Sequence, residues 1–235
     1  MALASALLKH YAISKLAHTH PWSRTVEVGF TRDAHQASVP RLPPLCRGRG
    51  VEEEQVWFNV SHQAGIVAIV AVAGYYPPAG GGVQVVSYLR HRVLAAVPGL
   101  LPPSPSAEQL VDAKLRAFYA LWALREAYVK LTGEALLAQW LRELEFRGFS
   151  PSRPTKGWGV PAREEEGEVV RDFDILFKGK RVEDVNMCLR SMGDDYMIAT
   201  ALRTPGKKKD GLGWELGEYE VLDLEDVLNF AEASG

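Results

Sequence analysis

Residues 107–131 carry apolar side chains at helical spacing over about seven turns. The apolar positions follow one another at steps of seven, four, three, four and three residues, namely Leu110, Ala117, Leu121, Leu124, Tyr128 and Leu131. Ser106 precedes the stretch as a candidate N-cap, and Thr132-Gly133 follows it as a candidate stop. The pattern predicts a long amphipathic helix whose apolar face packs against the rest of the fold.

Shorter runs on either side of this helix predict further elements. Runs rich in β-branched residues predict strands at 57–60, 66–72, 83–86, 169–177, 181–190 and 196–202. Helices are expected at 2–16, 134–144 and 221–231. Three prolines and two glycines predict a loop over 31–55, and four prolines predict a linker over 98–105.

This order of elements predicts an α+β protein with two pseudo-symmetric lobes, each a helix packed on an antiparallel sheet. The expected division is an N-terminal lobe, a shortened linker, a C-terminal lobe with the long helix, and a C-terminal tail, at 1–86, 87–106, 107–204 and 205–235. The sequence contains no clear internal repeat that would support the duplication.

The bulk properties exclude several classes of protein. A net charge of −2 argues against a nucleic-acid binder, whose footprint is a strong basic excess. No apolar run approaches the ~20 residues of a membrane span. The two cysteines, Cys46 and Cys188, form neither a disulfide framework nor a zinc spacing, which suits a reducing compartment. We therefore expect a cytoplasmic protein.

The predicted long helix carries a candidate site. Trp122, Glu126 and Lys130 are spaced i, i+4 and i+8, so they share one stripe of the helix. A glutamate there can hold a divalent cation or accept a proton, and a lysine one turn further can neutralise a phosphate. The simpler interpretation is a solvated Glu-Lys pair.

A second motif lies at the end of a predicted strand. Ser61-His62 closes the run Trp57-Phe58-Asn59-Val60 and places a hydroxyl and an imidazole where ligands often bind. The histidine can donate to a phosphate oxygen, or it can cap a turn without any ligand. Neither motif decides the function by itself.

Taken together, the two motifs resemble those of the 4'-phosphopantetheinyl transferases, specifically the two-lobed fungal type. Asn59-Val60-Ser61-His62-Gln63 resembles the central loop of that family. Trp122-x-x-Arg125-Glu126-Ala127-x-x-Lys130 resembles its signature helix, W-x-x-K-E-A-x-x-K, and the match continues through 131–137. The resemblance implies transfer of phosphopantetheine from coenzyme A to a serine of an acyl- or peptidyl-carrier protein, by a monomer.

The resemblance also implies roles for individual residues. Glu126 would hold Mg²⁺ and help remove the serine proton, and Lys130 would bind the pyrophosphate. The remaining positions that match coenzyme A-binding residues are Ser61, His62, Arg125 and, less securely, Lys9 and Arg32.

This sequence departs from the family pattern at its metal site. The family has a G-[VIT]-D segment whose aspartate is the principal metal ligand, and Gln84 stands there in Gly82-Val83-Gln84. A neutral amide should weaken Mg²⁺ binding, because Mg²⁺ favours anionic oxygen. A lysine after Arg32, an F-S-x-x-E segment before the signature helix and a strand region before Ala2 are also expected and not found.

Three functions remain open on this evidence. The chain is a slow transferase, a family scaffold reused for metal-independent chemistry on a small molecule in secondary metabolism, or a noncatalytic binder of coenzyme A or a carrier protein. A defective gene model would account for the missing segments, although not for Gln84.

Overall fold

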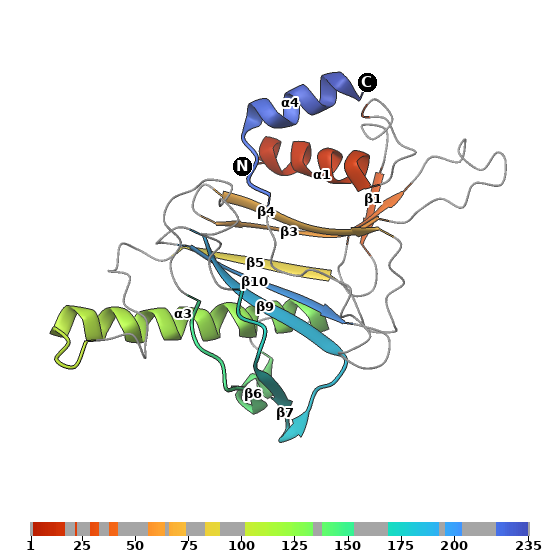
Figure 1. Ribbon diagram of the computed structural model, residues 1–235. Helices are drawn as coiled ribbons and strands as arrows, with labels where there is room; N and C mark the ends of the chain where they lie inside the picture. The colour runs from red at the N-terminus through yellow and green to blue at the C-terminus, as the bar shows by residue number, and fades with distance from the viewer. Residues whose placement is uncertain are drawn as a thin grey trace.

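A computed structural model gives the arrangement of the chain (Figure 1). For the segments 29–32, 38–41 and 83–89 the description covers the backbone. The structure describes residues 2–16, 22, 29–32, 38–41, 56–63, 66–73, 83–89, 102–133, 138–152, 169–192, 196–203 and 220–234.

Helix α3 (Ala107–Thr132) confirms the long helix predicted from apolar spacing, and its two ends form as the sequence indicated. The Ser106 hydroxyl accepts the backbone N–H of Gln109, and the Gln109 side chain accepts the N–H of Ser106. This capping box satisfies two N–H groups that a helix N-terminus otherwise leaves unpaired. Gly133 ends the helix with a φ of 74°, a left-handed conformation that glycine adopts without steric cost.

The buried face of α3 differs in part from the predicted one. Leu124, Tyr128 and Leu131 are buried as predicted, whereas Leu110 is 40% exposed. Small side chains make up much of the buried face instead, with Ala120, Ala123 and Ala127 fully buried. Alanine lets the helix backbone lie close to a neighbouring sheet, so small residues as well as large ones define the packing face.

The strands form antiparallel sheets. The first sheet has the order β1 (Gly29–Arg32), β2 (Ser38–Arg41), β3 (Val56–Gln63) and β4 (Ile66–Ala73). The second sheet has the order β5 (Val83–Leu89), β10 (Tyr196–Arg203) and β9 (Val185–Met192). A small sheet contains β6 (Leu144–Arg147), β7 (Asp174–Phe177) and β8 (Lys180–Arg181).

These elements lie in layers, which Figure 1 shows from the side. Helices α1 (Ala2–Leu16) and α4 (Leu224–Ala233) lie together outside the first sheet, and α1 contacts β4. The second sheet follows, and α3 packs on it through contacts with β5, β9 and β10. The two sheets meet where Ala68 of β4 packs against Ile198 of β10. The chain therefore has an α+β fold, whereas the predicted equivalence of two lobes and the predicted domain boundaries stay predictions.

The predicted loop over 31–55 is wrong in part, because β1 ends at Arg32 and β2 covers Ser38–Arg41. Proline is unfavourable in a strand because it cannot donate to a neighbour. Pro40 lies opposite Phe30 of β1, while β2 is in register with β3 at Ser38 and Phe58.

The helix predicted at 134–144 is also wrong where the structure describes it. Gln139–Glu143 forms a 3₁₀ helix, and Leu144 already begins β6 opposite Phe177. Residues 134–137 lie outside the described part of the chain. Tertiary packing decides this segment, because Leu144 and Phe146 are buried in the core that α3 shares with the second sheet. The short C-terminal helix is confirmed as α4, whose Asp223 and Asp226 form a capping box.

Candidate functional site

The signature stripe of α3 lies at the edge of the core. Trp122, Glu126 and Lys130 are half-buried, whereas Ala123 and Ala127 beside them are fully buried. Trp122 stacks on Phe118, with ring centroids 6.1 Å apart and an interplanar angle of 21°. The stripe thus presents a carboxylate and an ammonium at the border between protein and solvent, next to aromatic surface.

Lys130 is the electrostatically unusual group of this stripe. Its pKa lies below the ordinary value because burial removes water from the ammonium, while the nearby Glu126 carboxylate acts in the opposite direction. A partly dehydrated ammonium gains more from an incoming anion than a hydrated one does, because part of the cost of removing water has already been met. Lys130 is therefore suited to bind a phosphate.

Arg125 has a structural contact that the sequence did not indicate. Its Nη2 donates to the carbonyl oxygen of Leu144 at 3.3 Å, so the guanidinium connects α3 to the start of β6. The predicted role of Arg125 in binding coenzyme A stays a prediction, and this contact gives the residue a second role in holding the signature helix.

Gln84, which the resemblance places at the position of the family's metal-binding aspartate, has its backbone in β5. In the register of the sheet, Gln84 lies opposite Ala201 of β10. Ala201 is fully buried in the core cluster that includes Ala123 and Ala127 of α3. The register therefore places this position of β5 over the helix that carries Glu126, as a shared metal site would require.

Ser61 and His62 lie near the end of β3, as predicted. Ser61 is buried and lies opposite Ala68, which packs against the second sheet. His62 is exposed and lies opposite Val67. Because neighbouring residues of a strand point to opposite faces, the two side chains cannot serve one site from the same face. β5 contacts both β3 and α3, but the convergence of His62 with Glu126 stays a prediction.

The two remaining predicted phosphate-binding residues lie on different elements. Lys9 is half-buried on α1, and Arg32 ends β1 with its backbone opposite Ser38. Within the described ranges no group of three or more His, Cys, Asp and Glu side chains could hold a metal ion. In the same part of the chain, no helix is both long and apolar enough to cross a bilayer.

A buried polar cluster beside α3 was missed by the sequence analysis. Arg116 is fully buried, with its Nε donating to the Ser152 carbonyl at 2.8 Å and its Nη2 to the Ser191 hydroxyl at 2.5 Å. The hydroxyls of Ser152 and Ser191 also share a hydrogen bond of 2.7 Å. The signal that could have found it is Asp112 and Arg116 at i, i+4 among the small residues of the helix.

Comparison with known proteins identifies the class to which this helix and fold belong. No family model matches the chain. A protein of Fusarium mangiferae named 4'-phosphopantetheinyl transferase 1 is 39% identical over 259 residues, covering 99% of this chain and 78% of its own length. The transferase NpgA of Emericella nidulans is 33% identical, covering 96% of this chain and 80% of its own length. A transferase of Aureobasidium melanogenum is 29% identical over 98% of this chain.

An α+β chain with this signature helix, similar over nearly its whole length to such enzymes, is a phosphopantetheinyl transferase-type protein. It belongs to the fungal 4'-phosphopantetheinyl transferase family. The resemblance read from the two motifs is thereby confirmed.

Proposed function

We propose that this protein transfers the phosphopantetheine group of coenzyme A to a serine of an acyl- or peptidyl-carrier protein. The observation that carries the proposal is the pair Glu126 and Lys130 on α3, in which burial lowers the pKa of the lysine. Family membership adds the reaction, since the relatives are named as 4'-phosphopantetheinyl transferases.

In this reaction the carrier serine oxygen bonds to the phosphorus next to pantetheine, and the bond from that phosphorus to 3',5'-ADP breaks. Lys130 would bind the pyrophosphate and offset the charge that develops on the departing ADP. The Glu126 carboxylate would accept the serine proton, provided that the hydroxyl comes within hydrogen-bond reach. Arg125, Arg32 and Lys9 remain proposed contacts of coenzyme A, together with one of Ser61 and His62, whose side chains point to opposite faces of β3.

We propose that one carboxylate of the signature stripe, that of Glu126, would hold a Mg²⁺ ion in one of the ion's usual binding modes. Mg²⁺ often takes one or two protein carboxylates and completes its coordination with substrate phosphates and water. Glu126 would supply the carboxylate, and the coenzyme A pyrophosphate would supply further oxygens. When bound there, Mg²⁺ offsets the negative charge of the pyrophosphate. Since Gln84 contributes no charge, we propose that this protein needs more Mg²⁺ than a family member with aspartate at that position.

Gln84 also supports a second candidate function, in which the same scaffold acts on a small molecule without a metal. A direct experiment separates the two functions. The protein is incubated with coenzyme A, Mg²⁺ and an apo-carrier protein, and the carrier is weighed by mass spectrometry. A gain of one phosphopantetheine per carrier is the expected result. An unchanged carrier mass at stoichiometric enzyme, across several fungal carriers, would reject the transferase.

Gln84→Asp tests the metal site. A carboxylate at this position of β5 is expected to lower the Mg²⁺ concentration for half-maximal transfer by about tenfold, because an anionic oxygen binds Mg²⁺ more strongly than an amide. The measurement is the initial rate of carrier modification over a Mg²⁺ titration. Gln139→Asp makes the same change at an exposed residue of the 3₁₀ helix and should leave the titration unchanged. Equal titrations for both variants would mean that position 84 does not contribute to metal binding.

A further inference from the structure

A cavity of about 710 Å³ lies next to α1, the helix that Figure 1 shows on the far side of both sheets from α3. Its walls come from α1, from β4, from the neighbouring ends of β9 and β10, and from the segment that leads into α4. β4 is the last strand of its sheet, so residues from both faces of the strand reach the cavity. Its size lies within the ordinary range of small-molecule sites, about 300–1,000 Å³.

The lining is mostly apolar. Leucine, isoleucine, valine and alanine side chains of α1 and β4 make up most of the wall, together with Met192, Ile198 and Val227. A molecule that fills such a space gains about 0.8 kcal/mol for each CH₂ group removed from water. An alkyl or aryl body is therefore the part of a ligand that the cavity fits best.

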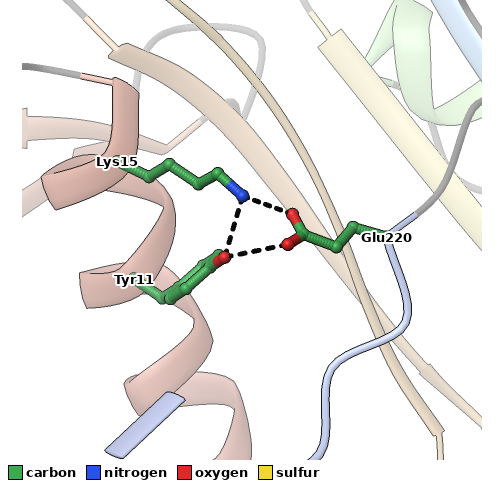
Figure 2. Close-up of polar contacts among 3 residues, drawn as sticks. All are labelled: Tyr11, Lys15 and Glu220. Atoms are coloured by element: carbon green, nitrogen blue, oxygen red, sulfur yellow. Dashed lines mark hydrogen bonds and ion pairs between the residues drawn. The ribbon is translucent and has the colours of Figure 1, made fainter. Parts of the chain in front are cut away.

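Three polar side chains of the lining, those of Tyr11, Lys15 and Glu220, form a hydrogen-bonded cluster, which Figure 2 shows. Lys15 Nζ lies 2.5 Å from Glu220 Oε2 and 2.9 Å from the Tyr11 hydroxyl oxygen, and donates to both. The Tyr11 hydroxyl donates to Glu220 Oε1 at 3.2 Å. The lysine charge is thus already compensated by the glutamate, which joins α1 to the segment before α4.

The charged residues of the lining indicate which polar head group of a ligand the cavity would bind best. Among the described residues that line it, the charged ones are Lys15, Glu220 and Asp223, that is, two carboxylates and one ammonium. Each carboxylate oxygen of Glu220 accepts one hydrogen bond from the cluster and has a second lone pair for another donor. The described lining thus combines a mostly apolar wall with one more carboxylate than ammonium groups.

We propose that this cavity binds a small amphiphile with an alkyl or aryl body and a cationic amine head, the amine donating to Glu220. This site differs from the proposed transferase site in its residues, because it is lined by α1, β4, the ends of β9 and β10 and the segment before α4, whereas Glu126 and Lys130 lie on α3.

A series of probes with one tail and different heads tests the proposal on the unmodified protein. Dissociation constants of octylamine, octanol and octanoate are measured by calorimetry at neutral pH. Octylamine is expected to bind about fivefold more tightly than octanol, and octanoate more weakly than both. Butylamine should bind at least tenfold more weakly than octylamine, because it buries fewer CH₂ groups. Absence of octylamine binding, or tighter binding of octanoate, would overturn the proposal.

Two variants and a matched control test whether octylamine binds in this cavity. Glu220→Gln should bring octylamine and octanol to nearly equal affinity, because the amide removes the negative charge. Ala71→Phe places a ring inside the cavity and should weaken octylamine at least tenfold, whereas Ala107→Phe at the exposed start of α3 should not. Circular dichroism confirms that each variant is folded. A folded Ala71→Phe protein with unchanged octylamine affinity would place the binding elsewhere and reject this site.

Discussion

Lys130→Met is expected to lower the rate of carrier modification by about 10²–10³-fold, the usual cost of losing one group that stabilises developing charge. The ammonium of Lys130 is half-buried, and this burial favours the binding of an anion. Methionine keeps the apolar stem of the side chain and removes the charge. The measurement is the initial rate of mass gain by the carrier under saturating coenzyme A and Mg²⁺.

Lys114→Met is the matched control, since Lys114 is an exposed lysine of the same helix and its loss should change the rate less than twofold. The same substitution at position 130 is expected to raise the melting temperature of the free protein by about 1–3 °C, because it removes a charge whose burial is unfavourable. A lower melting temperature together with lower activity would instead show that Lys130 has a structural role.

The pH dependence of stability and of coenzyme A affinity distinguishes an effect of the Lys130 charge from an effect of packing alone. The pKa of Lys130 is lower in the folded protein than in the unfolded chain, so between the two values the unfolded chain binds more protons. Through this lysine, the free energy of unfolding therefore rises with pH across that window. Coenzyme A affinity should change in the opposite direction, falling as Lys130 loses its proton, and Lys130→Met should lose both contributions.

Arg116→Met is expected to destabilise the fold by about 3–5 kcal/mol, because it removes the charged donor of two buried hydrogen bonds and leaves their acceptors unpaired. The guanidinium is fully buried and donates to the Ser152 carbonyl and the Ser191 hydroxyl, while Asp112 is buried one turn earlier on α3. The measurement is chemical denaturation, with a fall in melting temperature of roughly 6–20 °C as a second indicator.

Arg147→Met is the control for this prediction. Arg147 pairs with Glu145 at 2.7 Å, but its side chain is 63% exposed, and exposed ion pairs contribute about 0–1 kcal/mol. The same change of residue should thus cost much less stability at position 147. If both variants lose the same stability, the buried hydrogen bonds of Arg116 do not account for its effect.

Local signals predicted the elements that are long or strongly capped. α3 follows from its apolar spacing and from Ser106 and Gly133, because a capping box and a left-handed glycine act within a few residues of the chain. The short strands β1 and β2 were missed, because their pairing joins residues distant in the sequence, such as Ser38 and Phe58. The 3₁₀ helix at Gln139–Glu143 was mistaken for an α-helix because the burial of Leu144 and Phe146 overrides local preference.

Some features of the candidate site could also be predicted from the sequence, and others could not. Glu126 and Lys130 could be identified from the sequence, because their spacing on one helix fixes their common stripe. The partial dehydration of Lys130 and the contact of Arg125 with Leu144 could not, because both depend on what packs against α3. The cavity beside Tyr11, Lys15 and Glu220 could not be predicted from the sequence either, since residues 15 and 220 come into contact only in the folded chain.

The amino-acid sequence by itself determined the family of this protein, the course of α3 and the residues of its signature, since these depend on residue types at short separations. Tertiary structure decided which face of α3 is buried, that Gln84 lies in register with Ala201 over that helix, and where Arg116 finds its partners. The physical reason is that burial and strand register arise from contacts between distant segments, which no local pattern encodes.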